Sequence, residues 1–214
     1  MLDAEDGGRA RTLRAVKSRF STEAGRVEAF SDGVIAVIIT VMVLELKPPS
    51  GTDLHLLREI VPTFAAYVLS FVFVGIYWNN HHHMLRASDG VDGRAMWANL
   101  HLLFWLSLVP FTTRWMGENP SAAGPTALYG FVLLMCGFAY TLLQNALQAV
   151  NGPDSAFTKA VQGDLKGKMS LAFYVCAIGL AFVSTILSDV LYVVVAITWF
   201  IPDRRFESVI SGRG

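Results

Sequence analysis

The sequence predicts an all-α, polytopic membrane protein with six transmembrane helices, and three observations lead to this fold class. Hydrophobic residues make up 53% of the 214 residues and charged residues only 16%, whereas a soluble domain carries about 25% charge. The mean hydropathy is +0.46. The apolar residues gather in runs long enough to cross a bilayer, which takes about 20 helical residues, and no strand pattern or tandem repeat separates them. The formal net charge of +0 gives no reason to expect a nucleic-acid partner.

The first run, residues 26–46, reads R-V-E-A-F-S-D-G-V-I-A-V-I-I-T-V-M-V-L-E-L. As a helix it rises about 31 Å, which is enough to cross the hydrocarbon core. From Gly33 to Leu44 the only polar side chain is Thr40. Its first third is polar instead, with Arg26, Glu28, Ser31 and Asp32. Charged groups at one end of a membrane helix need partners, so this end indicates function.

Five further helices are expected after the break at Pro48–Gly51. The run from Met169 to Pro202 would be about 51 Å long as one helix, too long for a single crossing. A hairpin at Ser188–Asp189 is the natural way to divide it. The expected helices are therefore 57–78, 95–115, 125–150, 167–187 and 190–202.

The charge distribution predicts the domain organisation and the orientation. We expect a basic N-terminal arm over residues 1–25, a transmembrane domain over 26–202 and a tail over 203–214. Six crossings put 14 of the 17 lysine and arginine residues on the side of the two termini. Under the positive-inside rule both termini are cytoplasmic, in a multi-pass protein of the cell membrane. The arm would contact anionic membrane lipids.

This orientation brings polar residues from three helices to one membrane level. Asp32 lies about 9 Å along the helix from Arg26, inside the apolar boundary, where a carboxylate needs a donor such as an indole, an imidazole or an amide. We expect a structural polar network that holds the first helix against the second and third. Its candidate members are Arg26, Phe30, Ser31, Asp32, Trp78, Asn79, His81, His82, Trp97 and Asn99.

The triple histidine His81–His83 has three interpretations. Adjacent histidines on a helix point about 100° apart, so three in a row cannot all bind one ion, and we expect no metal and no cofactor. Structural hydrogen bonding is the expected role, and proton sensing is the alternative. An enzyme is not expected, because nucleophile-elbow, zincin and phosphate-loop motifs are all missing from the sequence, as is the T-V-G-Y-G filter.

Beyond the polar end, the first helix carries an apolar stripe. Val37, Val41 and Leu44 fall at i, i+4 and i+7, and Thr40 lies beside them. Such stripes are also common in ordinary membrane helices, so spacing alone does not assign a function to this one.

Several of these residues together resemble a known family. The segment Arg26-x-x-x-Phe30-Ser31-Asp32, continuing through Gly33–Glu45, resembles the signature of the endolysosomal and prokaryotic potassium channels, the transmembrane protein 175 family. The similarity extends to Tyr77–His82, Trp97–Asn99 and Leu106–Phe111. It covers the first three helices well, whereas the last three are similar mainly in number and length.

The resemblance implies a potassium channel that prefers potassium over sodium modestly and has an apolar constriction in place of a carbonyl filter. It implies a homotetramer, with the first helix of each subunit lining a central pore and K⁺ as the permeant ion. The pore positions correspond to Val37, Thr40, Val41 and Leu44, and a valine at 37 departs from the larger residue usual in the family. The alternatives are a proton-permeable, pH-sensing channel, a secondary transporter, for which inverted repeats are not seen, and a structural membrane protein.

Overall fold

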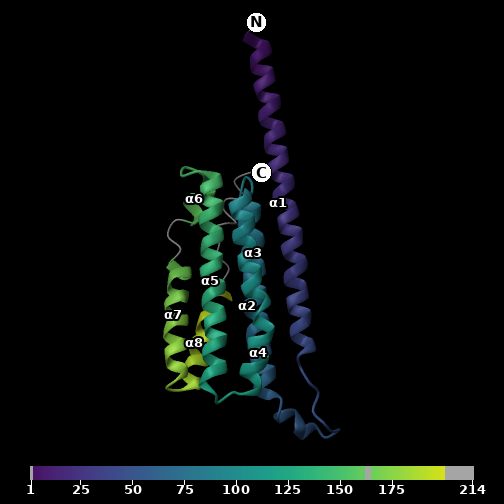
Figure 1. Cartoon of the computed structure of the whole chain (residues 1–214), viewed down its shortest axis with the longest axis vertical. Coiled ribbons are helices and arrows are strands. Elements are labelled where there is room, and N and C mark those ends of the chain that lie inside the picture. Colours follow the sequence, from purple (N-terminus) through teal and green to yellow (C-terminus); the bar gives the residue numbers. More distant parts are fainter. Residues whose placement is uncertain (1, 162–164, 201–214) are drawn as a thin grey trace.

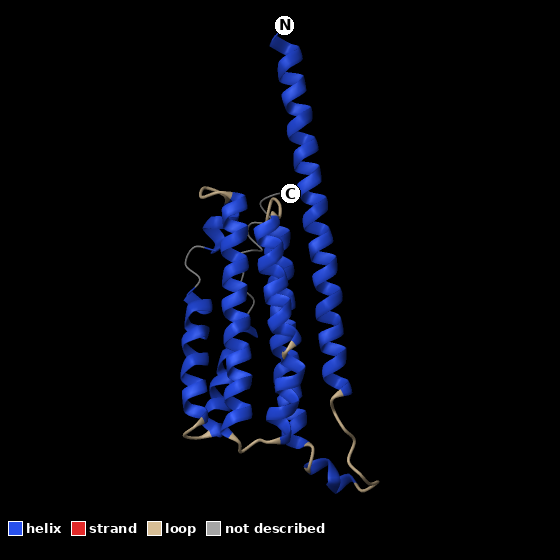
Figure 2. Cartoon of the chain, viewed as in Figure 1, coloured by secondary structure: helices blue, strands red, loops and turns tan. Residues whose placement is uncertain are grey.

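The computed structural model describes residues 2–161 and 165–200, and every regular element in these ranges is a helix, as Figure 2 shows. This confirms the all-α fold class. In chain order the elements are α1 (Leu2–Leu44), the 3₁₀ helix η1 (Leu54–Arg58), α2 (Val61–Ala87), α3 (Gly93–Ser107), α4 (Val109–Glu118), α5 (Ala123–Asn151), α6 (Ala156–Val161), α7 (Leu165–Ala181) and α8 (Thr185–Phe200).

Four helical stretches are long and apolar enough to cross a membrane: Glu23–Leu44, Val61–Ala87, Gly93–Glu118 and Ala123–Asn151. The helix α8 is apolar but shorter. Figure 1 shows these helices running side by side along the long axis of the molecule, with the N-terminal part of α1 extending past the others. The protein is therefore a multi-pass helical bundle.

The first helix is longer than the sequence predicted. It is continuous from Leu2 to Leu44, so residues 2–25 of the expected arm belong to the same helix as the apolar run. The helix α2 is also longer, because it continues through His81–His83 to Ala87 and does not end at residue 78. The three histidines consequently point in different directions around a helix.

The third predicted helix is divided in two. Pro110 has no N–H to bond within a helix, so α3 ends at Ser107 and α4 begins at Val109. Threonine hydroxyls use the carbonyls at this break: Thr113 Oγ1 donates to the Val109 carbonyl at 2.7 Å and Thr112 Oγ1 to the Leu108 carbonyl at 3.3 Å. The two pieces still form one membrane-spanning stretch.

The predicted hairpin at Ser188–Asp189 is wrong, because both residues lie inside α8. The turn falls at residues 182–184, where the backbone N–H groups of Val183 and Ser184 donate to the Leu180 carbonyl at 2.9 and 2.8 Å. Ser188 is fully buried, so its small side chain serves a helix contact and not a turn. The end of the predicted helix 190–202 and the tail 203–214 lie outside the described residues.

Two apolar clusters hold the bundle together. One joins the helices α1 to α6 and contains Ile35, Ile38 and Met42 of α1. The other joins α2, α4, α5, α7 and α8 around Tyr129 and Tyr192. Since α1 contributes one face to the first cluster and nothing to the second, it is attached to the bundle along that face alone.

The close approach of α4 to α2 gives a test of this packing. A Cβ at Gly117 would lie 2.7 Å from the backbone Cα of Thr63, which cannot move without shifting α2. We expect Gly117→Ala to destabilise the protein by about 1–3 kcal/mol and to lower its apparent melting temperature in detergent. The matched control is Gly75→Ala in α2, where a Cβ meets nothing within 4 Å. Equal melting temperatures for the two variants would contradict the packing of α4 on α2.

Candidate functional site

The described part of α1 has two distinct faces. Ile35, Ile38 and Met42 are 1%, 5% and 2% exposed, and they pack against the bundle. On the opposite side, Val37 and Leu44 are 59% and 79% exposed, at a mean angle roughly 140° from that buried face. Val41 is 37% exposed and Thr40 is also exposed. The four predicted pore positions therefore share one uncovered side of the helix in the single chain.

The Thr40 hydroxyl has a defined orientation. Its Oγ1 donates to the Val37 carbonyl at 2.9 Å, one turn back along α1. The hydroxyl hydrogen is therefore directed at the helix, which leaves the oxygen lone pairs available to a cation beside the exposed face. The sequence alone predicts the residue but not this orientation.

At the polar start of the apolar segment of α1, Asn99 of α3 joins three helices through its side-chain amide. Asn99 Nδ2 donates to Ser31 Oγ at 2.9 Å, and Asn99 Oδ1 lies 2.7 Å from His81 Nε2 of α2. All three side chains are buried. Ser31 Oγ also lies 2.8 Å from the Val27 carbonyl of its own helix. This amide therefore fixes the positions of α1, α2 and α3 relative to one another.

A second group of polar contacts lies between α1 and α2. Trp78 Nε1 donates to Asp32 Oδ1 at 2.9 Å, so the indole and not a histidine is the donor to this carboxylate. His82 Nδ1 lies 2.8 Å from Glu28 Oε1. Sequence reasoning did not select Glu28, although its position four residues before Asp32 places both carboxylates on one face of the helix.

The remaining predicted network residues lie apart from these contacts. Arg26, Phe30 and Trp97 are exposed, and Asn79 is half-buried. Arg26 and Phe30 line an open groove of about 350 Å³ between α1 and α3 that also contacts Met96. These four side chains point away from the α1–α2 contact. The prediction considered only their level in the membrane, which does not determine the direction of a side chain around its helix.

An ion cluster at the other end of α1 was also missed by sequence reasoning. Arg114 of α4 contacts the Glu45 carboxylate and donates from Nε to Glu118 Oε1 at 3.0 Å. Lys47 Nζ lies 3.9 Å from the same Glu118 oxygen. The sequence did contain a signal for this cluster. Arg114 lies inside an apolar run, and Glu45 lies at the end of the first predicted helix on the same side of the membrane. The apolar segment of α1 is thus tied to the bundle at both of its ends.

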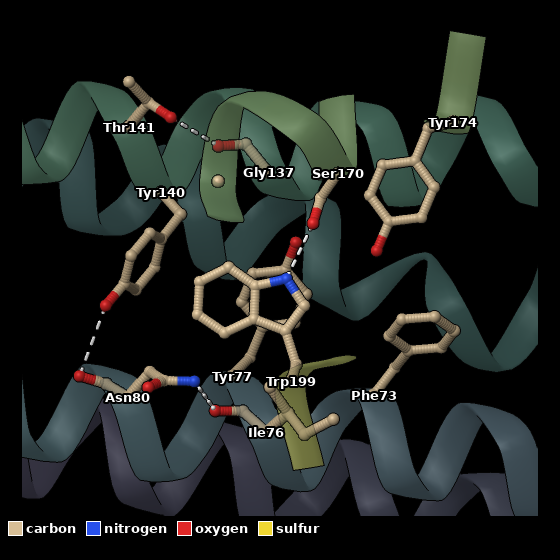
Figure 3. A pocket seen from close by; sticks show the side chains of 11 residues that line it. Phe73, Ile76, Tyr77, Asn80, Gly137, Tyr140, Thr141, Ser170, Tyr174 and Trp199 are labelled. Atoms are coloured by element: carbon tan, nitrogen blue, oxygen red, sulfur yellow. Dashed lines mark hydrogen bonds between the residues drawn. The ribbon is translucent and has the colours of Figure 1, made fainter. Parts of the chain in front are cut away.

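A small pocket lies on the other side of α2, where it meets α5, α7 and α8, and Figure 3 shows its aromatic lining. Its volume of about 40 Å³ corresponds to about three water molecules. Two hydrogen bonds cross its wall: Trp199 Nε1 donates to Ser170 Oγ at 2.7 Å and Tyr140 Oη to the Asn80 carbonyl at 3.3 Å (Figure 3). The pocket is too small for an organic ligand, and it is separate from the exposed face of α1.

Together these features define a multi-pass helical membrane protein whose first helix is fixed at both ends of its apolar segment and uncovered along one apolar face. The family described as "Endosomal/lysosomal potassium channel TMEM175" matches residues 26–110. A potassium channel of Chryseobacterium sp. (strain P1-3) is 48% identical over 183 residues, 86% of this chain and 95% of that relative. The chain belongs to the TMEM175 family.

Two further comparisons extend this result. The crystal structure of a lysosomal potassium-selective channel TMEM175 homolog from Chamaesiphon minutus matches with a TM-score of 0.73 and 28% identity, covering 85% of this chain and 98% of that one. The human endosomal/lysosomal proton channel TMEM175 is 25% identical over 124 residues, 56% of this chain and 24% of that protein. The family and these relatives are ion channels, and not enzymes, in agreement with the sequence prediction.

The Asn99 contacts give a direct test of the polar network. In Asn99→Ala the buried Ser31 and His81 side chains both lose a partner, so we expect a loss of about 2–3 kcal/mol and a lower apparent melting temperature in detergent. The control Asn145→Ala removes the same amide from an exposed position on α5 and should leave the melting temperature unchanged. Two variants as stable as the unmodified protein would show that Asn99 does not hold the three helices together.

Proposed function

We propose that the chain is one subunit of a homotetrameric potassium channel in which four copies of α1 surround the pore. The observation that carries this proposal is the exposed apolar face of α1, with Val37, Val41 and Leu44 opposite the packed residues Ile35 and Ile38. The relatives named as potassium channels support the choice of ion. Membrane lipids would cover the outer faces of the bundle.

Four copies of the exposed face would line a pore. A single helix has no lumen, but four copies related by a rotation axis enclose one. The ties at Asn99 and Arg114 would hold each α1 at a fixed distance from that axis. The groove that contains Arg26 and Phe30 lies beside the same face, where a neighbouring subunit would cover it.

Apolar rings explain how such a pore could prefer potassium without a carbonyl filter. A narrow ring of Val37, Val41 or Leu44 side chains excludes water when closed and makes a passing ion shed part of its hydration. Sodium holds its water more strongly than potassium, so it would pass less readily. A ring of Thr40 hydroxyls, each with its hydrogen directed at the Val37 carbonyl, would present oxygens to a partly dehydrated ion.

We infer six crossings, with α7 and α8 as the last two. At 17 and 16 residues they rise about 26 and 24 Å, which is near the thickness of the hydrocarbon core. Six crossings place both termini in the cytoplasm, because 14 of the 17 basic residues then lie on that side of the cell membrane. Residues 26–202 would form the channel domain between a cytoplasmic arm and tail.

Proton permeation is the second candidate function. It is favoured by the human relative, which is named as a proton channel. Both candidates use the same pore, so the permeant ion separates them.

Planar-bilayer recording of the purified protein tests the proposed function. With potassium on one side and sodium on the other, at equal pH, we expect a passive current whose reversal potential reports potassium preference. A pH gradient under symmetrical potassium should leave the reversal potential at zero. A reversal potential that follows the proton gradient would support the second candidate, and the absence of passive current would refute both.

The positions of two neighbouring exposed valines around α1 predict different effects of the same substitution. Val41 lies on the proposed pore stripe, whereas Val43 is 46% exposed but lies about 120° around the helix from Val37. We expect Val41→Asn to wet the ring, to raise the single-channel conductance several-fold and to weaken the preference for potassium. Val43→Asn is the control and should change neither property. Equal changes in the two variants would contradict the assignment of the pore face.

A further inference from the structure

We infer that Glu28, Asp32 and His82 form a binding site for a divalent transition-metal cation, represented by Zn²⁺, between α1 and α2. One ligand atom from each of these residues lies within 4.8 Å of the other two. The carboxylates come from adjacent turns of α1, and the imidazole comes from α2. This site is distinct from the proposed pore, because Asp32 and Glu28 lie about 140° and 180° around α1 from Val37.

The ligand types indicate the class of ion. Two carboxylates and one imidazole match the nitrogen and oxygen ligands of zinc, which accepts three protein ligands and a water molecule. Magnesium and calcium prefer sites made of oxygen alone. The three side chains are half-buried, so a cation can enter from the aqueous side and still be partly shielded from water.

In the part of the chain that the structure describes, several ligand atoms of the three side chains have no well-formed hydrogen bond and are available to a cation. His82 Nδ1 lies 2.8 Å from Glu28 Oε1 but is buried without a properly aligned hydrogen bond. Asp32 uses Oδ1 to accept from Trp78, and within the described ranges its second oxygen and that of Glu28 have no hydrogen-bond partner. A cation among these atoms would replace a poorly aligned contact with direct coordination and would neutralise two adjacent carboxylates.

Neighbouring side chains orient the ligands. The Trp78 indole donates to Asp32 Oδ1 at 2.9 Å and stacks on the His82 ring, with centroids 6.0 Å apart and planes 27° apart. Outer contacts of this kind fix ligand geometry in metal sites. Of the other two histidines, His81 is occupied by Asn99, and His83 points about 100° away from His82 on the helix. One histidine of the three therefore serves the site.

Metal binding would cross-link α1 to α2 about 7.5 Å along the helix from the level of Val37. If the proposed channel function holds, and opening moves α1 relative to α2, cytoplasmic Zn²⁺ should lower the open probability. This consequence rests on the proposed function, whereas binding itself does not require the protein to conduct.

Isothermal titration of the full-length protein in detergent, with Zn²⁺ in metal-free buffer, tests the site. We expect one Zn²⁺ per chain, with affinity at least tenfold weaker in His82→Gln and within twofold of the unmodified protein in the control His83→Gln. Mg²⁺ should give no saturable binding. Absence of Zn²⁺ binding, or equal affinity in the two variants, overturns the site and leaves only an ion pair between His82 and Glu28.

One further measurement keeps the site testable if His82→Gln does not fold, and a second tests its regulatory role. Pulsed electron paramagnetic resonance of Cu²⁺ bound to the unmodified protein should show modulation from the remote nitrogen of one imidazole, and modulation from none or from two would overturn the assignment. In bilayers, Zn²⁺ on the cytoplasmic side should lower the open probability of the unmodified channel but not of His82→Gln. Binding without this effect would retain the site and refute its regulatory role, whereas absence of all current would count against the proposed channel alone.

Discussion

The structure depends on one buried amide, the side chain of Asn99. It is the point where α1, α2 and α3 meet, since it donates to Ser31 and contacts His81 at 2.9 and 2.7 Å. In a membrane-spanning bundle water is not available to replace a lost partner, so a polar group of this kind must be satisfied by protein. The consequence is geometric as well as energetic, because a satisfied amide allows few rotations of α1 about its own axis. The rotation it selects leaves Val37 and Leu44 uncovered.

A second polar contact fixes the other end of the apolar segment of α1, so the orientation of the whole segment is determined. Arg114 holds Glu45 at the far end of the apolar segment, and Glu118 completes the cluster. Between the ties, α1 packs against the bundle through apolar side chains, chiefly Ile35, Ile38 and Met42. A metal ion at the proposed site of Glu28, Asp32 and His82 would add a further link between α1 and α2 close to the first tie.

The sequence predicted the broad features because strong physical terms determine them. Long apolar runs require membrane helices, and intramembrane polar residues such as Asp32 require partners. The sequence-based prediction failed where a feature depends on weak local preferences or on how two helices are placed relative to each other. Ser188 and Asp189 suggested a turn, but serine is also small enough for a helix contact, and the real turn at residues 182–184 includes apolar residues. The apolar composition of residues 95–115 predicted one continuous helix. Pro110 breaks it into α3 and α4, as a proline inside a helix is expected to do. The pairing of Asp32 with Trp78, and not with a histidine, follows from the rotation of α2, which the sequence pattern does not specify.

The central claim is that the uncovered face of α1 lines an aqueous pore, and cysteine accessibility tests it most directly. In a background with Cys176→Ser, which removes the exposed native thiol, cysteines would be introduced singly at Thr40 on the exposed face and at Ile35 on the buried face. A charged, membrane-impermeant methanethiosulfonate reagent would then be applied during potassium-current recording. The account predicts that Thr40→Cys loses most of its current while Ile35→Cys and the background channel are unaffected. Block at Ile35→Cys, or currents at Thr40→Cys that stay unchanged although labelling with a membrane-permeant reagent shows the thiol to be reactive, would contradict it.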